Sequence, residues 1–202
     1  MSAAGLGDNR KGKSLLVSID DFVALDVETT GLSPQTDKII EIGLVRVRQG
    51  KVREQYSSLI QPGRLISSRI ASLTGITNKM LIDAPSMEEI LPKALAFIGD
   101  DIIVGHNVNF DIGFMRAACQ TVMQCAFTND FVDTMRLGRA YFRDLPNHRL
   151  STLVSAFCIE QVEAHRALAD ALATARCYLH MCKHVAERKD QVTKVGMEGI
   201  RF

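Results

Sequence analysis

Residues 22–26 read FVALD and residues 39–48 read IIEIGLVRVR, and these two stretches decide the fold. The first is apolar up to its last residue, which is typical of a strand buried on both faces. The second is followed by the turn residues Gln49 and Gly50, which predict an antiparallel return strand over 52–60. The two stretches therefore predict a central strand followed by a β-hairpin.

Short apolar strands and amphipathic helices follow the hairpin. We expect strands at 101–105 and 130–133, helices at 86–97, 109–120, 134–142, 150–157 and 167–187, and loop with short helix over 64–85. This order predicts an α/β domain with a mixed sheet and helices on both faces. The domain is expected over 21–187, with an N-terminal lead-in over 1–20 and a polar, frayed C-terminal tail over 188–202.

The composition excludes several classes of protein. The 202 residues suffice for one ordinary domain, and 47% hydrophobic with 23% charged residues exclude a disordered or fibrous chain. Lys and Arg number 24 against 23 Asp and Glu, so the net charge of +1 favours neither nucleic acid nor membrane. No apolar run approaches the roughly 20 residues that span a bilayer, and we expect no membrane partner. Five cysteines without a CxxC pair or a secretion signal predict a cytoplasmic protein with reduced thiols.

One phosphate-binding pattern is a false lead. Residues 7–14, GDNRKGKS, match the form GxxxxGKS. That loop binds phosphate only where a buried strand enters it and a helix leaves it. Here no strand precedes the pattern and a strand follows it, so we interpret it as a flexible basic leader.

Acidic residues stand at the expected ends of strands and starts of helices. Asp26 and Glu28 are two apart on one strand, so their side chains share a face. Two carboxylates at the end of a buried strand are costly unless a cation neutralises them, which indicates a hard divalent metal. The alternative is that both acids face solvent. Asp111 falls in the first turn of a helix, where the helix dipole or a ligand site would favour it.

His165 and Asp170 occur in the alanine-rich stretch EAHRALADALATA. Five residues apart on one helix, the two side chains would diverge by about 140°. If both serve one site, His165 must lie in the loop before the helix and Asp170 in its first turns. The alternative is an ordinary amphipathic helix with a solvent-facing histidine.

Taken together, three motifs resemble the DEDDh, or DnaQ-like, family of 3′→5′ exonucleases. They are DVETTGL at 26–32, HNVNFD at 106–111 and HRALADA at 165–171. Within that family, the sequence most resembles bacterial proofreading exonucleases, namely the epsilon subunit of DNA polymerase III and the exonuclease domain of PolC. The stretches LTGITNKMLIDAPS (73–86) and NHRLSTL (147–153) are especially similar to the PolC type. The resemblance implies a ribonuclease H-like fold: a five-stranded mixed sheet, its second strand antiparallel, flanked by helices.

The resemblance, which covers about residues 22–185, also implies roles for the matching residues. The metal ligands, holding two Mg²⁺ or Mn²⁺ ions, would be Asp26, Glu28, Asp111 and Asp170, and the general base would be His165. The residues around the terminal nucleotide would be Thr29, Thr30, Leu32, His106 and Phe110, although each could be an ordinary turn or core residue. The expected reaction releases nucleoside 5′-monophosphates from single-stranded 3′ ends of DNA.

Other functions stay open on the sequence alone. An RNA 3′-exonuclease of the RNase T or oligoribonuclease type would use the same motifs. A catalytically silent nucleic-acid-binding module is a third candidate, against which the presence of His165 argues. A DNA polymerase subunit is a candidate partner. Only about 17 residues follow Val185, so we expect a stand-alone enzyme or a subunit that docks without a long extension.

Five arginines are concentrated within about 30 residues of the C-terminal half. They are Arg136, Arg139, Arg143, Arg149 and Arg166. They form either a solvated helix face or, if they face the site, contacts to phosphates that would make binding fall steeply with salt.

Overall fold

The computed structural model describes residues 11–160 and 165–198 and contains a six-stranded mixed sheet in the order β1-β6-β5-β2-β3-β4. The strands are β1 (Ser14–Leu15), β2 (Phe22–Thr29), β3 (Ile39–Arg48), β4 (Lys51–Leu59), β5 (Ile103–Gly105) and β6 (Phe131–Asp133). The pairs β2–β3 and β3–β4 are antiparallel and the other pairs are parallel. The predicted hairpin and the antiparallel second strand of the domain are thus confirmed.

The sheet has one strand more than predicted, because β1 extends it within the expected lead-in. The Lys13 carbonyl accepts from the Phe131 amide at 2.9 Å, which begins the pairing with β6. Further along, the Tyr178 hydroxyl accepts from the Ile19 amide at 3.1 Å and donates to the Val17 carbonyl at 2.9 Å. These partners are distant in sequence, so no local pattern signals the strand.

The phosphate-binding pattern leads into β1 and not into a helix, since Ser14 begins that strand. The first residues of the pattern, 7–10, lie outside the described residues. Within the described part, the context that a phosphate-binding loop needs after it is therefore missing.

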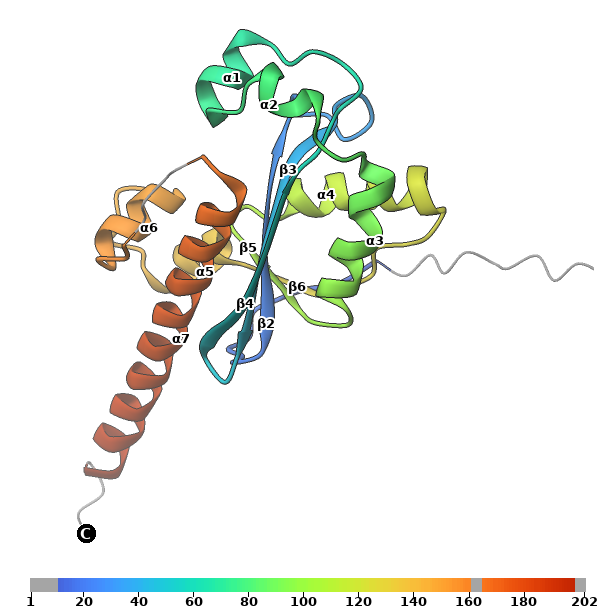
Figure 1. Ribbon diagram of the computed structural model, residues 1–202. Coiled ribbons are helices and arrows are strands. Elements are labelled where there is room, and N and C mark those ends of the chain that lie inside the picture. Colours follow the sequence, from blue (N-terminus) through green and yellow to red (C-terminus); the bar gives the residue numbers. More distant parts are fainter. Residues whose placement is uncertain (1–10, 161–164, 199–202) are drawn as a thin grey trace, which may run out of the picture.

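Helices cover both faces of the sheet (Figure 1). One face is covered by α3 (Met87–Ile98) and α4 (Asn109–Ala118) with the π-helical turn η1 (Cys119–Met123). The other face is covered by α5 (Thr134–Tyr141), α6 (Leu150–Ala156) and α7 (Ala167–Glu198). The short helices α1 (Ser68–Thr74) and α2 (Asn78–Ile82) lie at one end of the sheet. The predicted capping box of Ser86 and Glu89 begins α3. Among the described helices, none is both long and apolar enough to cross a membrane.

The last helix is longer than predicted. The segment 188–198, expected to be a frayed tail, continues α7 to Glu198. It contains no proline, and its Arg, Lys, Gln and Glu residues are good helix formers, so the helix continues past Glu187 in spite of Gly196.

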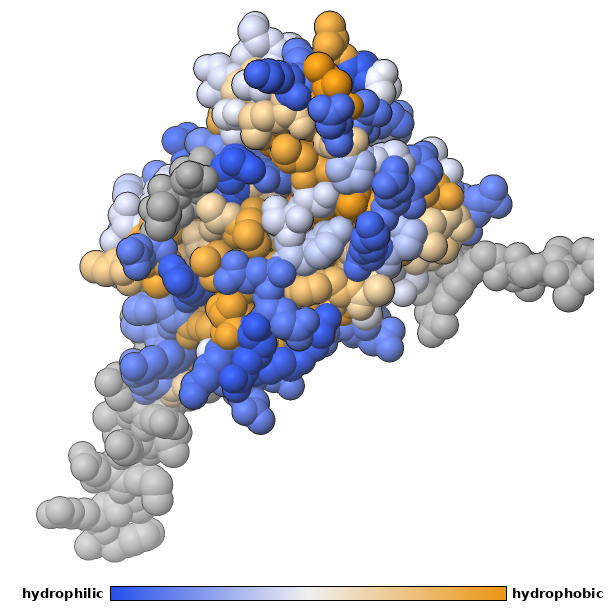
Figure 2. All heavy atoms as spheres, in the orientation of Figure 1, coloured by the Kyte–Doolittle hydropathy of each residue, from blue (hydrophilic) through white to orange (hydrophobic). Residues whose placement is uncertain are grey.

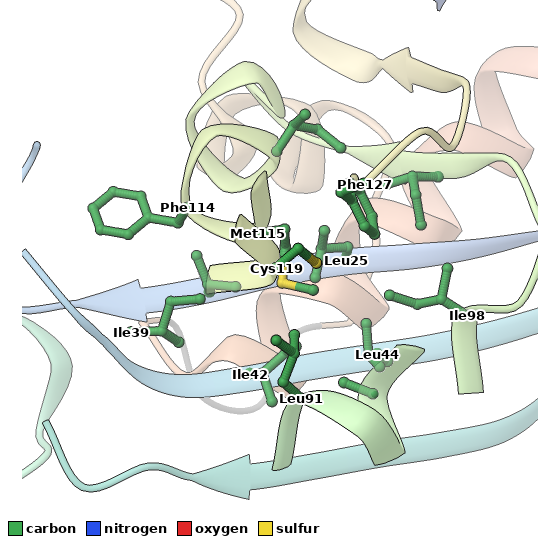
Figure 3. Packing of buried hydrophobic residues seen from close by; sticks show 14 of the residues in the cluster. Leu25, Ile39, Ile42, Leu44, Leu91, Ile98, Phe114, Met115, Cys119 and Phe127 are labelled. Carbon is green, nitrogen blue, oxygen red and sulfur yellow. The ribbon is translucent and has the colours of Figure 1, made fainter. Parts of the chain in front are cut away.

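Side chains along β2 alternate between two hydrophobic cores. On the face of the sheet that α3 and α4 cover, Leu25 packs in one core with Met115 of α4 (Figure 3). Phe22 and Ala24 pack on the opposite face with residues of α5, α6 and α7. Asp26 belongs to this second row and follows it directly. The apolar row that faces α7 therefore ends in carboxylates.

The start of α7 lies directly on β3. Gly43 pairs with Asp26 across the β2–β3 ladder. A Cβ atom on Gly43 would overlap the backbone of Ala167 and Leu168, so only glycine allows this approach. Ala171, one turn further on, is fully buried and continues the contact. This packing brings the first turn of α7 to the end of β2.

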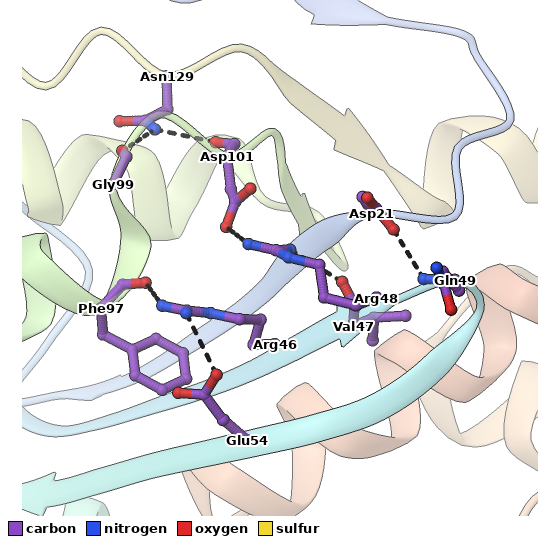
Figure 4. Close-up of polar contacts among 10 residues, drawn as sticks. All are labelled: Asp21, Arg46, Val47, Arg48, Gln49, Glu54, Phe97, Gly99, Asp101 and Asn129. Carbon is purple, nitrogen blue, oxygen red and sulfur yellow. Dashed lines mark hydrogen bonds and ion pairs between the residues drawn. The ribbon is translucent and has the colours of Figure 1, made fainter.

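A polar network holds the opposite end of the β3–β4 hairpin (Figure 4). Arg46 donates to the Phe97 carbonyl and to Glu54, with 3.3 Å between Nη1 and Oε1 of the latter pair. Arg48 forms an ion pair of 2.5 Å with Asp101. Because these contacts join β3 to α3 and its following loop, they fix the sheet at the end remote from Asp26.

The substitution Gly43→Ala tests the close approach of α7. We expect it to lower the free energy of unfolding by about 1–3 kcal/mol, because an added methyl group there forces backbone to move. The measurement is urea denaturation. Gly113→Ala is the matched control, since its new Cβ would meet the Pro34 ring at 3.3 Å and no backbone. Equal losses in the two variants would contradict the packing argument.

Candidate active site

Three carboxylates converge where β2 ends and α7 begins. Single oxygens of Asp26, Glu28 and Asp170 all lie within 4.8 Å of one another. The first two come from one face of β2, and Asp170 lies in the first turn of α7. Within 11–160 and 165–198, no other group of His, Cys, Asp and Glu side chains comes together in this way.

The fourth predicted ligand, Asp111, lies at the edge of β2. Strand β5 pairs with β2 only at Val23 and Ala24, so the β2 edge beyond them is open. There the Asp111 Oδ1 accepts from the Val27 amide at 3.0 Å, in place of a strand partner. Asp111 is buried in the first turn of α4. The structure thus ties this carboxylate to the backbone between the two acids of β2.

His165 precedes α7 and Asp170 lies in its first turn, as the five-residue spacing predicts. The His165 side chain is exposed, and its backbone amide donates to Asp170 Oδ2 at 3.3 Å. Its φ of 62° is unfavourable for a residue other than glycine. Such a conformation costs about 1–3 kcal/mol and persists only where neighbouring contacts impose it.

The site is strongly acidic, and its charges act on one another. Burial raises the pKa of Asp26 well above its usual value, and the charge of Asp111 raises it further. Burial and the charge of Asp170 raise the pKa of Glu28 to about 7, which Arg166 partly opposes. Burial raises the pKa of Asp111 to about 8, against the hydrogen bond from Val27. The folded protein therefore holds these groups together against their repulsion.

These residues fit a hard divalent cation. The converging donors are all carboxylate oxygens, which Mg²⁺ and Mn²⁺ prefer over nitrogen or sulfur. A cation placed among them would favour their ionised forms against both the burial and the mutual repulsion that raise their pKa values. The donor set and its electrostatics thus agree with the metal that the motifs imply.

Glu41 belongs to this region, although the sequence analysis did not single it out. It pairs with Glu28 across the β2–β3 ladder and is 1% exposed. Its carboxylate accepts from Arg166 Nη2 at 2.7 Å, from Arg166 Nε at 3.1 and 3.2 Å, and from the Ala167 amide at 3.0 Å. The available signal was a single acid inside the apolar strand IIEIG, which requires a buried partner.

The predicted arginine cluster does not act as one surface. Arg166 binds Glu41, and Arg136 donates to the Ser14 hydroxyl at 2.8 Å. Arg143 and Arg149 are exposed. At least two of the five thus make contacts within the fold, and of the other three only Arg139 lies within a helix.

A second buried acid, Asp133, holds the loop that leads to Asp111. Its Oδ1 accepts from the Asn107 amide at 3.0 Å and from the Met135 amide at 2.9 Å. It thereby caps α5 and fixes Asn107, whose φ is 56°. Because the loop from β5 to α4 is held at this point, the first turn of α4 has a fixed position.

The residues predicted to surround a terminal nucleotide have different environments. Thr29 donates to the Gly31 carbonyl at 2.6 Å, and the Thr30 hydroxyl lies 3.2 Å from the Asp37 carboxylate. The Nδ1 atom of His106 lies 2.9 Å from the Thr134 hydroxyl. The ring of Phe110 packs against that of Phe114, with 4.9 Å between their centroids. Leu32 is 84% exposed. Four of the five thus have structural contacts, and Leu32 alone among them is free to meet a ligand with most of its side chain.

Hydrophobic side chains are exposed over α1 and α2, at the same end of the molecule (Figure 2). Leu65 is 81% exposed, and Leu73 and Ile82 are exposed as well. The α1–α2 pair packs on Ile40 at the start of β3, the strand that carries Glu41. The α1–α2 pair is thus anchored on the strand that carries Glu41.

The fold and the site define a class of protein. A mixed sheet between helical layers, with carboxylates at the end of its central strand, is a ribonuclease H-like nuclease arrangement. The family model described as Exonuclease (RNase T) matches residues 23–178, and the chain belongs to this exonuclease family.

Relatives and solved structures agree with this assignment. The chain is 41% identical to the PolC-type DNA polymerase III of Bacillus subtilis over 86% of its own length, and 40% identical to that of Thermotoga maritima over 87%. It spans only 12% and 13% of those relatives. Escherichia coli exonuclease I with a dT13 oligonucleotide has the same fold, at 23% identity and a TM-score of 0.73, over 88% of this chain and 43% of that one. Exonuclease X in complex with 5′ overhanging duplex DNA is 27% identical, with a TM-score of 0.63, over 81% and 92%.

The raised pKa values predict how stability depends on pH. Because Glu28 and Asp111 have higher pKa values in the folded than in the unfolded chain, the folded chain binds more protons between about pH 4 and pH 8. We expect the metal-free protein to lose on the order of 6 kcal/mol of unfolding free energy from about pH 5 to about pH 8. Urea denaturation at each pH measures this.

Two further measurements complete the pH experiment. Mg²⁺ or Mn²⁺ should raise the melting temperature more at the higher pH, where the carboxylates are ionised. Asp111→Asn keeps the acceptor for Val27 and should flatten the pH dependence. A metal-free stability that does not fall with pH would contradict the electrostatic description of the site.

Proposed function

We propose that this chain is a metal-dependent 3′→5′ exonuclease that releases nucleoside 5′-monophosphates from single-stranded 3′ ends of DNA. The convergence of Asp26, Glu28 and Asp170 within 4.8 Å, next to Asp111, is the observation that carries the proposal. Membership of the exonuclease family and the similarity to PolC-type polymerases support it.

Each residue of the site has a distinct part in this reaction. Two divalent ions held by the four carboxylates would stabilise the charge of the phosphodiester and lower the pKa of the attacking water. By holding those ions at the end of β2, the carboxylates would determine where the scissile phosphate binds. The His165 imidazole takes up the proton of the attacking water, because a neutral imidazole has one ring nitrogen that can accept a proton. The 3′-oxygen of the penultimate nucleotide leaves.

The proposed substrate is single-stranded DNA, for two reasons. PolC-type relatives are DNA polymerases, and the fold neighbour exonuclease I was solved with a DNA oligonucleotide. The exposed Leu32, four residues after Glu28, gives apolar surface against which an unpaired base can pack without sequence preference. A DNA polymerase is the proposed partner, and an RNA 3′-exonuclease is the second candidate function, since phosphate chemistry is common to both.

Matched single-stranded DNA and RNA oligonucleotides, labelled at the 5′ end, test the function. With Mg²⁺, we expect a ladder of shortened DNA that disappears in EDTA. Asp170→Asn should reduce the rate at least about 10³-fold, because it removes a charge that the metal ions need. Asp144→Asn, at an exposed aspartate, is the control and should retain full activity.

The outcomes separate the alternatives. Immediate release of a labelled mononucleotide would show the opposite direction of degradation. Undiminished activity in EDTA would refute the metal mechanism. Faster degradation of RNA would favour the second candidate, and no degradation of either strand by folded protein would favour a silent binding module.

A further inference from the structure

Glu41 is a buried charge that none of the proposed catalytic steps uses. It lies on the face of β3 that is covered by α7, opposite Glu28 in the ladder, and its side chain is 2% exposed. Burying a carboxylate is costly unless hydrogen bonds and an opposite charge compensate it. Here both oxygens accept from Arg166, and Oε2 also accepts from the Ala167 amide.

The partners of Glu41 lie between two residues of the site. Arg166 directly follows His165, and Ala167 begins the helix whose first turn carries Asp170. The His165 amide in turn donates to Asp170 Oδ2 at 3.3 Å. The short segment 165–170 is thus attached to the sheet through Glu41 and closed on itself through Asp170.

The backbone of this segment needs such an attachment. His165 adopts a φ of 62°, which an isolated non-glycine residue rarely keeps. The packing of Ala167 on Gly43 limits how close α7 comes to β3, but a contact with a glycine supplies no directional bond. The planar guanidinium of Arg166 and the carboxylate of Glu41 supply that direction, since two paired hydrogen bonds fix orientation as well as distance.

We propose that Glu41 is a positioning residue, which sets the backbone of His165 and the side chain of Asp170 against the carboxylates of β2 by binding Arg166 and the first amide of α7. This inference rests on the proposed exonuclease function. Glu41 then affects turnover through Arg166 and Ala167, without being a ligand of the metal or of the substrate. Residues that orient metal ligands in this way typically change activity 10–100-fold when altered.

A different role for the same pair has to be separated from this one. Glu41 and Arg166 also line an open cleft of about 300 Å³ with Gln55 and Ser57. If Arg166 bound a substrate phosphate in that cleft, the loss of Arg166 would weaken DNA binding, make that binding less dependent on salt, and leave turnover unchanged. The positioning role predicts instead that turnover falls and DNA binding is kept.

The experiment uses the full chain and three variants of the pair. Glu41→Gln keeps the shape and one acceptor, Arg166→Lys keeps the charge but loses the planar fork, and the double variant combines them. Arg48→Gln is the matched control, because it breaks another ion pair of β3, with Asp101, at the remote end of the sheet. Steady-state kinetics on single-stranded DNA, Mn²⁺ titration and amide hydrogen exchange are measured on each folded protein.

For Glu41→Gln and for Arg166→Lys we expect kcat to fall about 10–100-fold, with KM within about twofold of the wild type. The double variant should be no worse than the poorer single one, because the two residues act as a unit. Amides 167–170 should exchange at least about tenfold faster, and Mn²⁺ should bind about tenfold more weakly. The control should keep kcat, Mn²⁺ affinity and exchange at 167–170.

An unchanged kcat in both single variants would overturn the inference, as would losses that add in the double variant. A higher KM with unchanged kcat in Arg166→Lys would replace it by the phosphate role. If the wild type shortened neither DNA nor RNA, the proposed function would fail. Hydrogen exchange and Mn²⁺ affinity would then still decide whether Glu41 positions the segment.

Discussion

Repulsion among buried carboxylates is the constraint on which this structure depends. Asp26, Glu28, Glu41, Asp111 and Asp170 act on one another at one end of the sheet. A fold can bring like charges together only if other interactions hold their supports in place. Glu41 is paired with an arginine, and Asp111 accepts a hydrogen bond from a strand amide. The other three carboxylates converge at a place that suits a cation.

The elements around the site compensate this repulsion in different ways. The edge of β2 binds Asp111 through a backbone amide, so α4 is docked by the same hydrogen bond that holds its carboxylate. Helix α7 is docked by the absence of a side chain at Gly43 and by the charge of Glu41. The hairpin is fixed at its far end by Arg46 and Arg48. Stabilising contacts at one end of the sheet thus support a destabilising cluster at the other.

Much of this arrangement can be derived from the sequence, for definite reasons. The apolar run that ends in Asp26 predicts a buried strand with a charged end, and the spacing of His165 and Asp170 places one before and one inside a helix. Both are local patterns. The two-residue strand β1 is set by pairing with Phe131 and Val132, far away in the chain, and carries no periodicity of its own.

The same reasoning explains why the sequence left the role of the arginines open. The partner of Arg166 is Glu41, which is 125 positions away. Only the antiparallel register of β2 and β3 brings Glu41 next to the site. The length of α7 was missed because charged residues without apolar spacing predict a tail as readily as a helix. Long-range register and helix continuation are decided by tertiary packing.

Gly43 also limits how this chain can change over generations. Any other residue there would push α7 outward, and Asp170 moves with the helix. Alanine, the smallest alternative, would already place its Cβ 2.2 Å from the backbone of Ala167. A change at position 43 therefore has to be accompanied by a change in the path of α7, which also carries Asp170.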